Sequence, residues 1–217
     1  RTSNPNLLFR ETCLGTFTGA LVRLISNIRA KHGQDAVNLK YCGRFDLAED
    51  LSDIADITHI DLSSIFSLHG DIAALGNCTN LEKADFYRCF EITGSFEVFM
   101  GLLALQELDI GCTNVDCSCA LELISMAPWA LQIKTLELGG SDLNVQGDIA
   151  ALKHCPRLQI ANFFKCKKIT GDIAALENCA NLLYADFSYT NITGDIAALG
   201  NCTNLEDANF YKCSKII

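Results

Sequence analysis

The sequence predicts an α/β solenoid, in which short strand-and-helix units stack side by side. Two observations favour this fold class. A segment containing Gly-Asp-Ile-Ala-Ala-Leu occurs four times, at intervals of 77, 24 and 23 residues, and each copy leads into Asn-Cys-x-Asn-Leu or a variant of it. A short apolar-x-apolar step follows each copy. Because one such unit cannot bury its own apolar side chains, the units are expected to stack into one continuous core.

The strand of each unit is predicted from a period of two. The pattern is apolar-x-x-apolar-x-apolar, as in Leu105, Leu108 and Ile110, and alternation of this kind is typical of a strand with one buried face. The first apolar positions are separated by 24, 24, 28, 25, 24 and 23 residues, which defines seven units, one of them enlarged; they are Ile57, Leu81, Leu105, Ile133, Leu158, Leu182 and Leu205.

The helical part of each unit is predicted from Gly-Asp-Ile-Ala-Ala-Leu. Asp after Gly is a suitable helix N-cap, and Ile72 and Leu75 are three residues apart, as on one face of a helical turn. Each unit is therefore expected to run from strand to turn to a short helix, and then back to the next strand.

Composition narrows the class of partner. The chain has 217 residues, 49% of them hydrophobic, and a net charge of −9 from 17 Lys+Arg and 26 Asp+Glu. It is too apolar to be disordered. Its negative charge disfavours nucleic acid or an anionic membrane as the main partner. No apolar run approaches the roughly 20 residues of a membrane-spanning helix.

The units resemble leucine-rich repeats. Ile-Thr-Gly-Asp-Ile-Ala-Ala-Leu-Gly-Asn-Cys-Thr-Asn-Leu, ending at Leu205, is most similar to the plant-type subclass, although Ala73, Ala150, Ala174 and Ala197 replace the Pro of that subclass. The resemblance covers residues 45–217. It implies a right-handed horseshoe with a concave parallel sheet and short convex helices, binding through the concave surface, and no catalytic residues.

The two ends differ from the repeats. Residues 1–44 do not repeat, and Leu21, Leu24, Ile25 and Ile28 predict an amphipathic helix that caps the solenoid or, alternatively, binds a partner. The chain begins at Arg1 and stops where another Ile-Thr-Gly would begin. We therefore expect a processed or partial chain, whose open C-terminal end is covered by further residues or by a partner.

The residues between the apolar strand positions form three columns on the concave face. Since neighbouring strands lie about 4.8 Å apart, the acidic central column predicts a docking stripe for a basic partner, flanked by aromatic anchors. The alternative is that these side chains are merely solvated. The candidate partner-binding residues are Asp61, Asp85, Tyr87, Asp109, Glu137, Asn162, Phe164, Tyr184, Asp186, Asn209 and Tyr211.

The 12 cysteines are interpreted as free thiols, because most recur at fixed repeat positions, as a small buried residue would. This interpretation places the chain inside the cell, in a reducing compartment. Sequons at Asn77, Asn191 and Asn201 are the counter-indication, since glycosylation there would contradict it.

Signals for chemistry are few. Cys112, Cys117 and Cys119 could ligate a metal, but their spacing is not that of a known site and the alternative is a structural loop. Trp129, in the enlarged unit, is assigned equally to a binding loop or to added core. We therefore predict a protein without enzymatic activity and without a cofactor or metal.

The predicted function is a protein–protein interaction module that binds a protein or peptide, preferably basic, on its acidic and aromatic concave face. The alternative is a structural subunit of a larger multiprotein assembly, which contacts its partners through its ends or its convex face.

Overall fold

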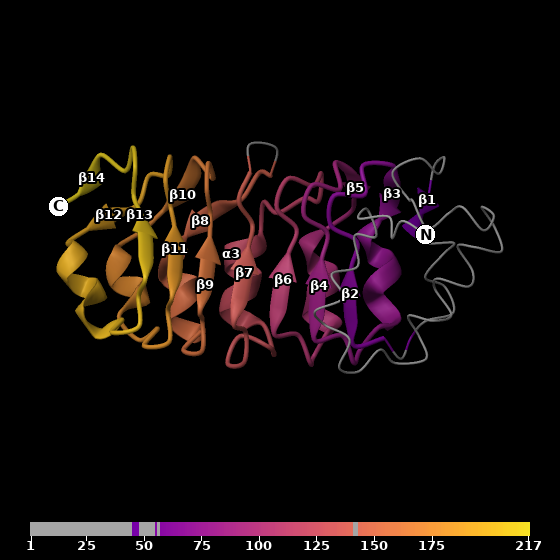
Figure 1. The fold of residues 1–217 in the computed structure, drawn as a ribbon, viewed down its shortest axis with the longest axis horizontal. Coiled ribbons are helices and arrows are strands. Elements are labelled where there is room, and N and C mark those ends of the chain that lie inside the picture. The colour runs from indigo at the N-terminus through magenta and orange to yellow at the C-terminus, as the bar shows by residue number, and fades with distance from the viewer. Residues whose placement is uncertain (1–44, 48–54, 56, 141–142) are drawn as a thin grey trace, which may run out of the picture.

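The computed structural model describes residues 45–47, 55, 57–140 and 143–217. These residues form an elongated stack in which strands lie on one side and helices on the other (Figure 1). The predicted solenoid is thus confirmed, whereas the helix expected within residues 1–44 lies outside the described residues.

One parallel sheet of seven strands runs the length of the stack (Figure 1). Its order is β13-β11-β9-β7-β6-β4-β2, so consecutive units are neighbours in space. The strands are β2 (His59–Asp61), β4 (Lys83–Asp85), β6 (Glu107–Asp109), β7 (Thr135–Glu137), β9 (Ile160–Asn162), β11 (Tyr184–Asp186) and β13 (Asp207–Asn209). All seven begin at the position that the repeat predicts.

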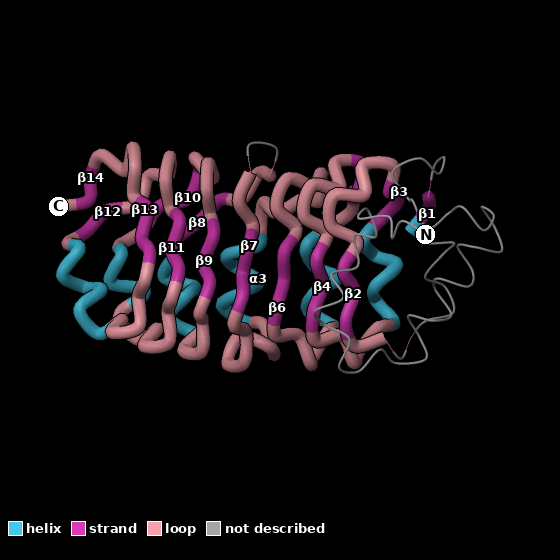
Figure 2. The backbone as a smooth tube through the Cα atoms, viewed as in Figure 1, coloured by secondary structure: helices cyan, strands magenta, loops and turns pink. Residues whose placement is uncertain are grey.

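Short helices cover the other side of the sheet (Figure 2). Five are 3-10 helices: η3 (Ile72–Asn77), η4 (Phe96–Gly101), η5 (Ile149–His154), η6 (Ile173–Leu176) and η7 (Ile196–Asn201). The predicted caps are present, because the carboxylate of Asp71 accepts a hydrogen bond from the Ala73 amide at 2.8 Å. Asp148, Asp172 and Asp195 do the same in their own units.

The Gly before three of the helix caps has a packing reason that involves the preceding unit of the stack. Gly171 has φ +110, and a Cβ at this position would overlap the Asp148 carboxylate of the preceding unit. Gly94 and Gly194 meet Asp71 and Asp172 in the same way. Gly94, Gly171 and Gly194 therefore leave room for the cap of the preceding unit and permit a positive φ.

A second set of short strands lies beyond the turn of each unit, and the sequence analysis did not predict it. It consists of β1 (Phe45–Asp46), β3 (Leu68–Asp71) and β5 (Glu91–Thr93), then β8 (Gln146–Asp148) with β10 (Lys168–Thr170), and β12 (Thr193–Gly194) with β14 (Lys215–Ile216). Each strand is too short, and has too few apolar residues, to show a period of two.

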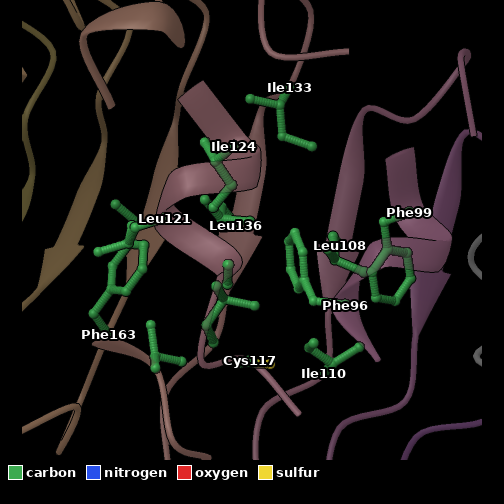
Figure 3. Packing of buried hydrophobic residues seen from close by; sticks show 14 of the residues in the cluster. Phe96, Phe99, Leu108, Ile110, Cys117, Leu121, Ile124, Ile133, Leu136 and Phe163 are labelled. Carbon is green, nitrogen blue, oxygen red and sulfur yellow. The ribbon is translucent and has the colours of Figure 1, made fainter. Parts of the chain in front are cut away.

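The enlarged unit interrupts this second set of strands, because its extra residues form the α-helix α3 (Ala120–Met126). Leu121 and Ile124 of α3 are buried; in Figure 3, Ile124 lies beside Leu136 of β7 and Leu121 lies beside Phe163 of the next unit. Trp129 is fully buried, and its indole N–H donates to the Phe99 carbonyl at 2.7 Å. Of the two interpretations of Trp129, the structure supports added core.

Buried side chains form one continuous core between the sheet and the helices. Ile60, Leu108 and Leu136 point inward from the strands and are at most 1% exposed. The rings of Phe163 and Phe187 stack at 5.2 Å between centroids, and Phe187 stacks on Phe210 at 6.1 Å. Since each unit covers the next, the core has no boundary between units.

Candidate interaction surface

The central column of the seven-stranded sheet lies on the face turned away from the helices, which we call the open sheet face. Parallel pairing places Asp61 opposite Asp85, Asp85 opposite Asp109, and Asp109 opposite Glu137. Asn162, Asp186 and Asn209 continue the same row. The structure therefore brings the whole predicted column together in its predicted order.

Most of these side chains also hold the turn that follows their strand. An oxygen of Asp85 accepts a hydrogen bond from the Tyr87 amide at 3.1 Å, and an oxygen of Asp109 accepts one from the Gly111 amide at 2.8 Å. Asp61, Asn162, Asp186 and Asn209 accept from the residue two positions on in the same way. The interpretation as merely solvated side chains misses this role, which Asp and Asn share because both carry a suitable oxygen.

Four successive strands contribute carboxylates with no amide residue between them: Asp61, Asp85, Asp109 and Glu137. We call these four residues the acidic row. Burial raises the pKa of Asp85 to about 6, and the Asp61 charge adds to the effect. Burial raises the pKa of Asp109 to about 8, with the Glu137 charge second. In both residues, removal of the carboxylate from water raises the pKa more than the neighbouring charge does.

One cation lies beside the acidic row. The Lys83 ammonium is 3.1 Å from an oxygen of Glu107. Burial lowers the pKa of Lys83, but the hydrogen bond to Glu107 and the charges of Glu107, Asp85 and Asp61 outweigh it, so the pKa is raised. This pair occupies the first column, and it leaves the Asp109 and Glu137 carboxylates facing each other.

Further along the sheet, amide side chains separate the carboxylates. The Asn162 amide donates to Glu137 at 3.2 Å, and the Asn209 amide donates to Asp186 at 3.2 Å. Asp186 also accepts from the Tyr184 hydroxyl at 3.3 Å and the Ser188 hydroxyl at 2.6 Å. Asp186 is only 8% exposed, so little of its carboxylate is left for a partner.

Three of the aromatic candidates, Tyr87, Phe164 and Tyr211, lie just after the carboxyl ends of their strands, whereas Tyr184 is the first residue of β11. A Cβ on Gly111 would lie 3.2 Å from the Tyr87 ring, so the ring covers this Gly. Phe164 contacts Tyr189 at 6.0 Å between ring centroids, and Tyr189 contacts Tyr211 at 5.4 Å. Tyr184 is separate from this cluster and is held by its bond to Asp186.

No disulfide bond joins cysteines of the described residues, and most of these cysteines are buried. Their thiols donate to backbone carbonyls of the neighbouring unit, as Cys89 does to Leu62 at 3.1 Å and Cys213 to Phe187 at 2.9 Å. Burial raises the pKa of Cys89, Cys155, Cys166 and Cys179 to about 12. These thiols therefore stay protonated and act as small packed donors.

The other chemical candidates do not converge. Cys117 is buried, whereas Cys112 and Cys119 are partly exposed. In residues 57–140 and 143–217, no group of three or more His, Cys, Asp or Glu side chains is arranged to hold a metal ion. The described part of the chain also contains no helix that is long and apolar enough to cross a membrane.

Solved structures with a similar arrangement of units include plant receptors. No protein-family model matches the sequence, and comparison with curated proteins gives no match. The leucine-rich-repeat ectodomain of GASSHO1/SCHENGEN3 from Arabidopsis thaliana, in complex with CASPARIAN STRIP INTEGRITY FACTOR 2, superposes with a TM-score of 0.58 and 15% identity, over 79% of this chain and 23% of that chain. The chain has the leucine-rich-repeat fold.

Two other plant receptors share this leucine-rich-repeat architecture. The peptide hormone receptor RGFR1, in complex with RGF2, has a TM-score of 0.58 and 19% identity over 75% of this chain and 28% of that one. The Arabidopsis receptor kinase HAESA, in complex with the peptide hormone IDA and the co-receptor SERK1, has a TM-score of 0.55 and 21% identity over 74% and 27%. The present leucine-rich-repeat chain thus spans about a quarter of the length of these receptors.

Proposed function

We propose that the chain is a non-catalytic interaction module that binds a basic protein segment or peptide on its open sheet face. The observation that carries this proposal is the acidic row, in which four carboxylates lie on successive strands and two have raised pKa values. Holding like charges side by side destabilises the unbound protein. A cationic partner removes that cost, so part of the repulsion becomes binding free energy.

The spacing of the acidic row defines a suitable partner. Three steps between strands at about 4.8 Å span roughly 14 Å. An extended peptide presents alternate side chains about 6.7 Å apart, so three basic residues at every second position cover nearly the same distance. The Tyr87 ring lies at the edge of the row, where the Arg88 guanidinium of this chain already lies 5.1 Å from the ring centroid.

The similar structures support the proposal by analogy. RGFR1 is described as a peptide hormone receptor in complex with RGF2, and HAESA is described in complex with the peptide hormone IDA. In those proteins the fold therefore accommodates a peptide. At these identities the analogy extends to the fold alone. The acidic row of this chain is the independent reason to propose a basic partner. A reducing compartment inside the cell is proposed on the buried, protonated thiols.

The test uses Asp→Asn variants, because Asn occupies the same column at Asn162 and Asn209 and keeps the bond to the following turn. The probe is a synthetic peptide with Lys at alternate positions. We expect the double variant Asp85→Asn, Asp109→Asn to weaken binding about tenfold at low salt and at a pH above the raised pKa of Asp109, where both carboxylates are ionised, measured by fluorescence anisotropy.

The matched control is Glu177→Gln, which removes one exposed carboxylate next to η6 on the helical side of the stack. It should leave the affinity within about twofold, since its charge is remote from the row and screened. Equal loss in the control, or unchanged affinity in the double variant, would show that the acidic row is not the binding surface.

The alternative function, a structural subunit that makes contacts through its convex face, is favoured by a different observation. Leu103, Met126 and Leu131, in neighbouring units next to η4 and α3, are 59%, 62% and 69% exposed. Exposed apolar side chains in one region are typical of contact surfaces. If Leu103→Gln with Leu131→Gln abolishes a native assembly that Asp85→Asn leaves intact, the structural role is the correct one.

A further inference from the structure

The carboxyl-terminal units carry basic side chains along the edge where the strands end. Three neighbouring loops, residues 163–171, 187–194 and 210–217, contain five Lys and no Asp or Glu, in a chain whose net charge is −9. We call the lysines and the aromatic residues beside them the basic edge. It consists of Phe164, Lys165, Lys167, Lys168, Tyr189, Tyr211, Lys212 and Lys215.

Backbone hydrogen bonds fix these loops side by side. The Lys165 amide donates to the Ser188 carbonyl at 2.9 Å, and the Tyr189 amide donates to the Tyr211 carbonyl at 2.8 Å. Lys165, Tyr189 and Lys212 occupy the same turn position and share a left-handed backbone, with φ of 64°, 61° and 65°. The loops follow β9, β11 and β13 at the same edge of the sheet (Figure 1).

Aromatic rings and ammonium groups alternate along this edge. The Lys165 ammonium lies 4.7 Å from the centroid of the Phe164 ring, and the Lys212 ammonium lies 5.3 Å from that of Tyr211. Tyr189 lies between the two pairs and contacts both rings. Tyr189 and Tyr211 are 38% and 59% exposed, so their faces are open to a partner.

The charges of the basic edge are not neutralised within the part of the chain that the structure describes. None of its five lysines forms an ion pair there. Ring contacts join Phe164, Tyr189 and Tyr211 along this edge. Lys165 and Lys212 therefore lie on the same edge, although their positive charges repel each other. An anionic group placed between or beside them is therefore favoured by charge complementarity.

We propose that the basic edge is a docking surface for an acidic segment of a partner protein. The two lysines are two strands apart, about 10 Å, and their long side chains can reach acidic residues at positions i and i+4 on one face of an extended segment, with an apolar or aromatic residue at i+2 between them. A short segment fits better than a long polyanion, since the net charge of the chain repels the latter. The proposal does not depend on the acidic row, although Phe164 and Tyr211 adjoin both surfaces.

The experiment measures binding of a synthetic 12-residue peptide that contains repeats of Glu-Phe-Gly-Glu. The control peptide has Gln in place of every Glu. We expect the first peptide to bind more tightly than the second at low salt. The double variant Lys165→Glu, Lys212→Glu should weaken its binding at least tenfold, because two attractive contacts become repulsive.

The chain offers a matched control variant in Arg88→Glu. Arg88 occupies the same turn position with φ 61°, and its guanidinium lies 5.1 Å from the Tyr87 ring centroid, but it belongs to an amino-terminal unit. Its replacement should leave the affinity within about twofold. Equal losses in Arg88→Glu and the lysine variant, or no loss in either, would overturn the proposal.

Two further measurements separate this proposal from the others. The double variant Asp85→Asn, Asp109→Asn should not weaken binding of the acidic peptide, whereas it weakens binding of the Lys peptide if the proposed function is correct. The proposal for the acidic row and the proposal for the basic edge can therefore be contradicted independently of each other. Tighter binding of a single-stranded oligonucleotide, or of vesicles containing anionic lipid, than of the acidic peptide would show that the partner class is wrong.

Discussion

The two halves of the stack have the same backbone but opposite surface chemistry. The amino-terminal strands β2, β4, β6 and β7 carry the acidic row, in which carboxylate faces carboxylate. In β9, β11 and β13, Asn162 and Asn209 alternate with Asp186 and donate to the neighbouring carboxylates. The basic edge follows these three strands. The same repeat can thus carry different charges on a similar backbone, because the exposed positions do not determine how the buried core packs.

The largest expected effect is the loss of stability when an Asp of the central column is replaced by Ala, which should differ between a buried Asp and a more exposed one. Asp186 is 8% exposed and accepts from Ser188, Tyr184 and Asn209. Asp186→Ala leaves buried donors without partners and should lower the free energy of unfolding by about 3 kcal/mol. Asp61→Ala loses similar bonds to Ser63 at a more exposed place, and should cost about 1 kcal/mol. Urea unfolding measures both, and equal losses would contradict the distinction.

The second effect is the pH dependence of the acidic row. The pKa of Asp109 is raised from 3.8 to about 8, so the folded state holds a proton that the unfolded chain has lost. Stability is therefore greatest below the unfolded pKa and falls as the pH rises toward 8. Asp109→Asn should make this decline shallower and raise stability at pH 8 by about 2 kcal/mol, after allowance for partial contact with water.

Urea midpoints measured at several pH values between 4 and 9 test this effect. The matched control is Glu177→Gln, which should leave the decline unchanged, because its carboxylate lies on the helical side and is exposed. If the stability of the unsubstituted protein rises between pH 4 and pH 9, the raised pKa of Asp109 is contradicted.

A smaller effect is expected when the acidic row is lengthened. Asn162→Asp keeps the oxygen that holds Phe164 but replaces the donor to Glu137 with a charge. It should lower stability by about 1 kcal/mol at pH 8, and by less at pH 5. The same urea unfolding at the two pH values provides the measurement. No difference between them would show that Asn162 does not separate the charges.

The smallest effect should be equal in the two halves. Cys89 and Cys166 donate from equivalent positions to Leu62 and Leu138, and Thr113 and Thr190 occupy this position in other units. Cys89→Thr and Cys166→Thr should each change stability by less than about 1 kcal/mol. Thermal unfolding of both variants would show whether equivalent positions in the two halves contribute equally to stability. A large loss in one alone would mean that the halves also differ in their packing.

Repetition made much of the fold predictable. All seven strands of the large sheet, the Asp caps of the helices and the order of the central column follow from residues that recur at fixed intervals. The second set of strands was missed, because Glu91–Thr93 and its equivalents contain at most one buried residue each and show no alternation. The bond from the Asp85 carboxylate to the Tyr87 amide was also missed, although Asp and Asn at one repeated position indicate such a turn.

The basic edge shows what the sequence analysis could not supply. The five lysines are visible in the sequence, but they occupy two segments about 45 residues apart, with Tyr189 in a third. Only the stacking of units places Lys165, Tyr189 and Lys212 on adjacent turns. The depth of burial of Asp109 and Asp186, which sets the pKa of the first and the bonding of the second, likewise depends on neighbouring units.

The sequence by itself determined that the chain is a stack of short units and which residues of each unit point inward, because the apolar period is local and recurs in every unit. The tertiary structure alone decided which polar side chains meet between units, how deeply each carboxylate is buried, and where charges of one sign gather. Those properties arise from contacts between residues about 24 positions apart, and the free energy of a charge depends on all the groups that surround it.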